Sequence, residues 1–147
     1  MNVMQILLSV VVLGLNVALI VDIWKQIQLD KVAYLNNDKS RDYSRWTPSD
    51  LAIAAYISMF VDKEVRLDNH FQAVVYAVLK RSERAVDEKI RRMSTIGAEK
   101  SDASVADVDA VFLVSTYEEK EAREIFALDL LASGASSKQI EVLKSYI

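Results

Sequence analysis

The only histidine of the chain is the natural starting point in a search for catalytic or metal-binding residues. His70 follows Asp68 by two positions and Glu64 by six, so one imidazole and two carboxylates lie close together in the sequence. Such a set can bind a metal ion or act as a base. Zinc sites and Ser–His–acid sets need further ligands or partners, and the chain has no second imidazole and no thiolate. We therefore interpret His70 as a surface residue at the start of a helix.

The composition argues against other kinds of chemistry. The absence of Cys excludes disulfides, thiolate nucleophiles and Cys-based zinc sites. Gly97 and Gly134 fall where helices are expected to end, so no glycine-rich phosphate-binding loop is predicted. The net charge of -3 gives no general attraction to nucleic acid. We predict that the protein is not an enzyme, and that it has no catalytic, cofactor-binding or metal-binding residues.

The beginning of the chain is strongly apolar. Residues 1–21 carry no charged side chain. Within residues 6–21 the apolar run is interrupted only by Ser9, Gly14 and Asn16. A bilayer core of about 30 Å needs about 20 apolar helical residues, and Trp24 and Lys25 suit the headgroup zone that follows. The sequence predicts a transmembrane anchor over residues 1–24, in contact with membrane lipid.

Basic residues beyond the anchor predict its orientation. No Lys or Arg precedes the apolar run in this sequence, and the following segment carries Lys25, Lys31, Lys39, Arg41 and Arg45. Because basic residues favour the cytoplasmic side, we expect the N-terminus outside and the rest of the chain in the cytoplasm, at a bacterial inner membrane. A cleaved signal peptide is an alternative, although no basic start and no small-x-small cleavage site before Asp22 are present. A helix buried in a large soluble assembly is another.

Small residues in the anchor indicate a possible contact between membrane helices. Gly14 and Ala18 form a small-xxx-small pair, and Asn16 lies between them. This spacing lets two helices approach closely, and an Asn amide can form a hydrogen bond across the contact. Gly14, Asn16 and Ala18 are therefore the candidates for self-association through the membrane.

The rest of the chain divides into a polar juxtamembrane linker over residues 25–46 and a helical domain over residues 47–147. One Pro and three Gly in the whole chain argue against a turn-rich β fold. We predict an all-α protein with one N-terminal transmembrane helix, followed by a small helical bundle of about four helices.

The first two helices of the domain are marked by caps and by apolar spacing. Thr47 and Pro48 begin a helix that we expect to reach residue 65, and its nearly continuous apolar run over residues 51–61 predicts burial on all sides. A second helix is predicted from residue 69 to residue 93 or 96, ending near Gly97.

The later segment is more ambiguous. Residues 105–132 form either one long helix or two helices kinked near Ser115, with Thr116 and Glu119 as a capping box for the second. A short strand over residues 111–117 is a further alternative, because this run is rich in β-prone residues. After Gly134, a capping box of Ser136 and Gln139 predicts a last short helix.

Charges are segregated along the domain. Residues 80–92 hold six basic and three acidic side chains, whereas residues 102–129 hold eight acidic and two basic ones. The simplest interpretation is an antiparallel helical hairpin with opposite charges facing, and the alternative is two solvated faces that never meet. The basic stretch is also a candidate for contact with anionic lipid, although its three acidic residues weaken that interpretation.

These observations favour a single-pass membrane-anchored interaction module, an accessory or regulatory subunit of a membrane-associated assembly that binds other protein subunits. Aromatic residues and Met are typical of interface centres, so the partner-contact candidates are Tyr56, Met59, Phe60, Phe112 and Tyr117. The alternative is a membrane-tethered DNA-binding regulator that uses a helix-turn-helix-like hairpin over residues 128–147. Its second helix carries only Lys138 and Lys144 against Glu141, so we do not expect nucleic acid as a partner.

Overall fold

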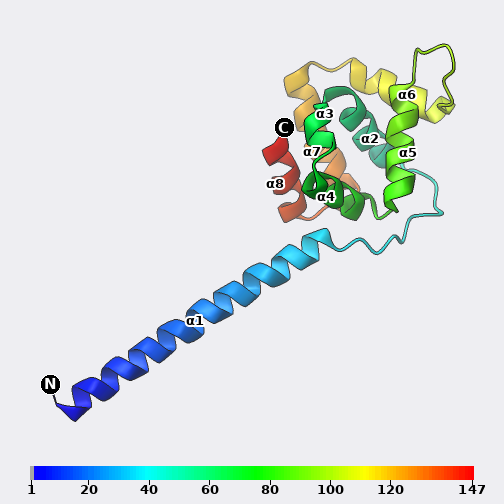
Figure 1. The fold of residues 1–147 in the computed structure, drawn as a ribbon. Coiled ribbons are helices and arrows are strands. Elements are labelled where there is room, and N and C mark those ends of the chain that lie inside the picture. The colour runs from blue at the N-terminus through cyan, green and yellow to red at the C-terminus, as the bar shows by residue number, and fades with distance from the viewer. Residues whose placement is uncertain (1) are drawn as a thin grey trace. The chain divides into compact units, whose positions relative to one another are not determined.

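A computed structural model describes residues 2–147, and it describes the side chains of these residues except for residues 26–32. All regular structure in this part of the chain is helical, which confirms the predicted all-α fold with an apolar N-terminal helix followed by a bundle (Figure 1). The helices are α1 (Val3–Leu35), α2 (Pro48–Phe60), α3 (Lys63–Arg66), α4 (Asn69–Leu79), α5 (Glu83–Ser94), α6 (Val105–Ser115), α7 (Glu119–Ala132) and α8 (Ser137–Tyr146).

The chain forms two compact units, one ending at Ala33 and one over Tyr34–Ile147. The first unit is most of α1. Its stretch Val3–Lys25 is 23 residues long, apolar enough to cross a membrane, and has no buried residue. At about 1.5 Å per residue it is about 35 Å long, enough for a hydrocarbon core of about 30 Å. Gly14, Asn16 and Ala18 are all exposed along it, and their pairing with another helix stays a prediction.

Helix α2 lies at the centre of the second unit, packed against α5, α6 and α7 (Figure 1). It begins as predicted, because Thr47 Oγ1 accepts a hydrogen bond of 3.1 Å from the backbone N–H of Asp50, and Pro48 occupies the first turn. Ile53 and Ile57 are at most 1% exposed. Burying each such side chain contributes about 1.5–3 kcal/mol, so α2 is the main apolar element of the core.

Several predicted helices are shorter than expected, and α2–α8 are therefore more numerous than the four predicted. The first ends at Phe60 because Val61 is extended, with φ -89° and ψ 125°, and α3 follows. The second is broken into α4 and α5, because Lys80 adopts the left-handed conformation with φ 53° and Ser82 caps a new helix. The single helix predicted from residue 69 to residue 93 is therefore wrong.

The segment over residues 105–132 consists of two helices, α6 and α7. The alternatives of one long helix and of a strand over residues 111–117 are therefore wrong. The expected capping box of Thr116 and Glu119 does not form. Thr116 instead ends α6, and its hydroxyl donates a hydrogen bond to the carbonyl of Leu113. Helix α7 begins at Glu119, and its N-cap residue Glu118 forms no side-chain cap hydrogen bond.

Part of the predicted linker over residues 25–46 belongs to the helical unit. The side chains of residues 26–32, including Lys31, lie outside the described part of the chain. From Tyr34 onward the chain belongs to the helical unit, and Tyr34 is 6% exposed in its core. The amide of Gln139 donates a 2.9 Å hydrogen bond to the carbonyl of Tyr34. The helical unit therefore includes residues 34–46 as well as the predicted residues 47–147.

Candidate functional site

The five predicted partner-contact residues fall into two groups. Tyr56 is 5% exposed and stacks on Phe126, with ring centroids 4.2 Å apart, and on Phe60 at 5.2 Å. Tyr56 is therefore a core residue, and Phe60 and Tyr117 are half-buried at the edge of the core. Met59 and Phe112 are 39% and 70% exposed, so only these two are available to a partner.

Phe112 belongs to a larger exposed surface, which we call the α6 apolar strip. It consists of Val105, Val108, Phe112 and Leu113. The last three follow Val105 by three, seven and eight positions, which is the spacing of one helix face. The opposite side of α6 packs against α2 through Val114. An exposed apolar face of this kind is typical of a protein-binding surface. Of these four residues only Phe112 was predicted from the sequence as a partner contact, although their helical spacing is visible there.

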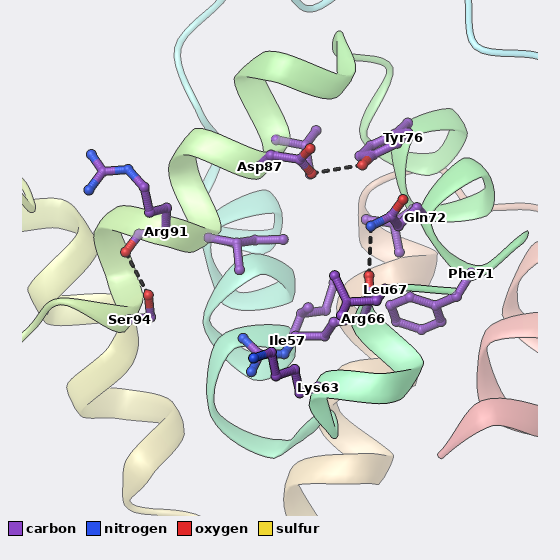
Figure 2. Close-up of a pocket in the computed structure, with 13 residues that line it drawn as sticks. Ile57, Lys63, Arg66, Leu67, Phe71, Gln72, Tyr76, Asp87, Arg91 and Ser94 are labelled. Atoms are coloured by element: carbon purple, nitrogen blue, oxygen red, sulfur yellow. Dashed lines mark hydrogen bonds between the residues drawn. The ribbon is translucent and has the colours of Figure 1, made fainter. Parts of the chain in front are cut away.

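A cavity of about 310 Å³ lies between α3, α4 and α5, and we call it the α3–α5 groove (Figure 2). Its apolar lining comes from Ile57, Phe71, Val75, Val86 and Ile90. Its charged lining comes from Lys63, Arg66, Asp87 and Arg91. Volumes of small-molecule pockets begin at about 300 Å³, so this groove suits a few apolar side chains rather than a large cofactor.

Hydrogen bonds fix the walls of the groove. At one end the Tyr76 hydroxyl donates a 2.7 Å hydrogen bond to Oδ1 of Asp87, joining α4 to α5 (Figure 2). Burial, together with this hydrogen bond, raises the pKa of Tyr76. At the other end the Gln72 amide donates to the carbonyl of Arg66 over 2.8 Å and fixes the end of α3. The groove is thus preformed, with cations of α3 beside an apolar floor.

A buried ionic cluster is the second unusual feature of the unit. Arg81 is 1% exposed, and its guanidinium donates to the backbone carbonyls of Arg41, Ser44 and Arg45. It also lies 4.3 Å from the ring centroid of Trp46. Burial lowers the pKa of Arg81. One side chain of the turn between α4 and α5 therefore holds residues 41–46 against the bundle.

The carboxylate of Asp50 completes this cluster. It is fully buried, 3.8 Å from the Arg81 guanidinium and 3.4 Å from that of Arg41, and it accepts a 2.8 Å hydrogen bond from the Ser133 hydroxyl. Here the carboxylate is enclosed by α2, the turn after α7 and the 41–46 segment, so its role is to join these elements. The burial of Arg81 could not be predicted from its neighbours in the sequence, because it lies in a basic run.

Helices α4 and α5 form a helix-turn-helix with a three-residue turn, Lys80 to Ser82. In DNA-binding proteins the second helix of such a unit enters the major groove and meets phosphates. On α5, Arg91 instead pairs with Glu88 at 2.8 Å and with Asp102 at 2.7 Å. Arg91 in turn lowers the pKa of Glu88 to about 2. Because acidic side chains neutralise Lys89, Arg91 and Arg92, α5 fits a protein surface better than DNA.

The C-terminal hairpin of α7 and α8 is the site of the alternative DNA-binding prediction. In helix-turn-helix proteins, residues near the start of the second helix contact the bases. At the start of α8, Gln139 is 8% exposed and bonded to Tyr34, whereas Ser137 and Lys138 are exposed. Arg41 also donates a 2.9 Å hydrogen bond to the carbonyl of Ser133, in the turn. The geometry therefore gives this alternative no support.

His70 is exposed at the start of α4, and its Nε2 lies 3.4 Å from the Tyr34 hydroxyl. Asp68 caps α4 by accepting a 2.9 Å hydrogen bond from the N–H of Phe71, which lowers the pKa of its carboxyl. Within residues 2–147, leaving aside the side chains of 26–32, no three His, Cys, Asp or Glu residues are grouped as a metal site.

The segregated charges meet over part of their length. Lys89 of α5 bonds Asp107 of α6 at 3.0 Å, and Arg91 bonds Asp102. The hairpin with facing charges therefore exists between α5 and the start of α6. It does not extend to α7, where Glu121 and Glu124 form no ion pair with any side chain that the structure describes.

Comparison of the chain with models of known protein families, with curated proteins and with solved structures found no match. Its function must therefore be inferred from its own residues and geometry.

Proposed function

We propose that this protein is a single-pass membrane-anchored interaction module, an accessory or regulatory subunit of a membrane-associated assembly. The observation that carries this proposal is the stretch Val3–Lys25, which is apolar, 23 residues long and without a buried residue. The helical unit has its own core. A helix of this kind is stable in hydrocarbon, because its side chains are apolar and its backbone N–H and C=O groups form hydrogen bonds within the helix.

The exposed leucines of α1 favour transfer of this helix from water to hydrocarbon. Leu8, Leu13 and Leu15 are each more than 60% exposed in α1. Removing a Leu side chain from water contributes about 1.5–3 kcal/mol, and the stretch Val3–Lys25 repeats this gain at many positions. Basic residues at the end of the stretch Val3–Lys25 and beyond it, among them Lys25 and Arg41, favour a cytoplasmic location for the helical unit. Trp24 adds an aromatic ring suited to the interface.

The surface of the helical unit supports binding rather than catalysis. The α6 apolar strip exposes four apolar side chains, and the buried polar cluster is closed and structural. A membrane anchor raises the effective concentration of such a surface toward partners in the same membrane. We therefore expect the partner to be another protein subunit that contacts α6.

A photoreactive amino acid placed at Phe112 in the full chain tests this proposal in native membranes. We expect a discrete crosslinked product in the membrane fraction. The matched control is the same group at Ser137, an exposed polar position on α8. Equal labelling at Phe112 and Ser137, or no product at Phe112, would contradict an interaction surface on α6.

A further inference from the structure

We infer that the α3–α5 groove binds helix α7 of a second copy of this chain, in a head-to-tail contact. This inference goes beyond the proposed function, because it requires neither the membrane nor the α6 apolar strip. It rests on two surfaces of the helical unit that are complementary in charge and in apolar character.

Two cations of α3 lie beside the apolar floor of the groove. Lys63 and Arg66 of α3 line it, and neither forms an ion pair with any side chain that the structure describes. Nε of Arg66 is buried and has no hydrogen-bond partner among the described atoms. A buried donor without an acceptor is costly, and a carboxylate is the acceptor that guanidinium groups bind best. The groove therefore fits an occupant with acidic and apolar side chains on one face.

Helix α7 carries such a face, which we call the α7 acidic stripe. It consists of Glu121, Glu124, Leu128 and Leu131, all exposed, and the two leucines are 63% and 62% exposed. Their spacing of three, seven and ten positions places them on one side of the helix. The opposite side of α7 is buried through Ala122, Phe126 and Leu130, which holds the stripe outward. Helices with such anchors bind in apolar grooves.

The order of the side chains in the stripe matches the groove. Ten residues of helix span about 15 Å, with both glutamates toward the start and both leucines toward the end. In the groove, Lys63 and Arg66 lie at the α3 end, away from the Tyr76–Asp87 hydrogen bond (Figure 2). Docking of the glutamates at this end places the leucines over the floor near Val86 and Ile90.

The α6 apolar strip is a weaker fit for the same groove. Its side chains are apolar, but among its nearest acidic neighbours Asp107 is already bonded to Lys89. Asp109 alone stays exposed beside the strip. Charge complementarity therefore selects α7 rather than α6 as the occupant.

Because groove and stripe are different surfaces of one unit, each copy offers one surface to each of two neighbours. Such a contact closes into a ring or extends as a chain. It differs from the symmetric contact predicted for Gly14 and Ala18, in which the same residues of two copies meet. The two modes of self-association can therefore be distinguished by which positions crosslink.

Disulfide trapping is a sharp test, because the chain contains no Cys. Two full-length single-Cys variants, Ile90→Cys on the floor of the groove and Leu128→Cys on α7, carry tags of different size and are mixed in detergent micelles. A disulfide requires Cα atoms about 4.4–6.8 Å apart, so only a seated helix allows the bond. We expect the mixed dimer to form at least five times faster than either homodimer.

Leu113→Cys on the α6 apolar strip replaces Leu128→Cys as the matched control, because it is 54% exposed and equally apolar. A mixed Ile90–Leu128 product no more abundant than the Ile90–Leu113 product would overturn the inference. The assay uses no membrane, so its outcome is independent of whether α1 spans a bilayer.

A charge swap provides the second test. Arg66→Glu and Glu124→Lys, each made in the full chain, are expected to weaken self-association at least tenfold by analytical ultracentrifugation in detergent. Mixing the two variants pairs Glu at position 66 with Lys at position 124 and is expected to restore association. Circular dichroism checks that each variant keeps its helices. Unchanged association of the folded single variants, or no restoration in the mixture, would contradict the contact.

Discussion

Helices α1 and α2 have similar compositions and opposite surroundings. Both are almost entirely apolar over their central residues. Within Val3–Lys25 of α1 no residue is buried, whereas α2 buries seven of its 13 residues. At about 1.5 Å per residue α2 is about 20 Å long, too short for a hydrocarbon core of about 30 Å. Length and available partners, rather than composition, decide which solvent an apolar helix requires.

The two helices also differ in how they accommodate charge. Helix α2 carries the buried Asp50 in its first turn, held by Arg81, Arg41 and Ser133. In α1 the first charged residue is Asp22, after 21 residues without charge. A protein interior can supply partners to a buried charge, and a bilayer core cannot do so without cost.

The largest expected loss of stability comes from removing Arg81, an ion-pair partner of Asp50 in α2. Arg81→Met removes one of the two guanidinium groups beside the buried Asp50 carboxylate and frees residues 41–46 from the bundle. Such a loss costs about 3–5 kcal/mol of unfolding free energy. Urea denaturation of the full chain in detergent, followed by Trp46 fluorescence in a Trp24→Phe background, measures it. Arg45→Met, at an exposed position, is the control, and equal losses for both variants would contradict a buried ionic cluster.

A matched pair of truncations compares the surroundings of the two helices directly. Ile53→Ala in α2 leaves a cavity in the core and is expected to cost about 2–5 kcal/mol. Leu13→Ala in α1 is expected to leave the unfolding of the helical unit unchanged, because Leu13 is 68% exposed and lies outside that unit. The same denaturation experiment gives both values. A similar loss for Leu13→Ala would show that α1 is part of the core.

An added charge is expected to affect membrane insertion when it lies in α1, but not when it lies in the helical unit. Leu13→Arg near the middle of α1 is expected to oppose membrane insertion by about 2.5–3.5 kcal/mol. The membrane-bound fraction of the newly made chain measures this effect. Leu113→Arg, on the exposed face of α6, is expected to leave that fraction unchanged. Equal distribution of the two variants between membrane and supernatant would mean that α1 does not insert.

The smallest effect concerns a carboxyl beside α2. Asp129 of α7 lines a small cavity with Ala52 and Tyr56, and burial raises its pKa to about 6 from 3.8. Since the folded state binds this proton more tightly than the unfolded state, the group opposes folding fully above pH 6. This penalty falls between pH 6 and 4 and is absent below about 3.8.

Asp129→Asn therefore stabilises the unit at pH 7 and has no effect at pH 3.5. A shift of about two pKa units corresponds to at most about 3 kcal/mol, and partial exposure of Asp129 reduces this to roughly 1 kcal/mol. The difference in melting temperature between variant and parent, measured at both pH values, isolates this carboxyl from the others. A difference that is constant from pH 3.5 to 7 would exclude the raised pKa.

Local signals in the sequence predicted much of the fold. The caps at Thr47 and Ser136 and the helix end near Gly134 depend on neighbouring residues only, and each lies where expected. The break between α4 and α5 was missed because a Lys, rather than a Gly, adopts the left-handed conformation there. Only Ser82, a good N-cap, indicated that a new helix begins at this point.

The candidate surfaces were harder to predict because they depend on distant contacts. Arg81 lies in a basic run, yet its partners are carbonyls at residues 41, 44 and 45. Tyr56 has the composition of an interface residue but meets Phe126, 70 positions away in the sequence, in the core. The α3–α5 groove arises only after the predicted second helix breaks, so no helical pattern of an unbroken segment could reveal it.

Extraction of the full chain from membranes with alkaline carbonate tests the central claim most directly. Carbonate strips peripheral proteins, and an inserted helix keeps its protein in the bilayer. If α1 spans the membrane, the chain stays in the pellet after ultracentrifugation and enters the supernatant only with detergent. Recovery of the intact chain in the supernatant without detergent would contradict the membrane anchor.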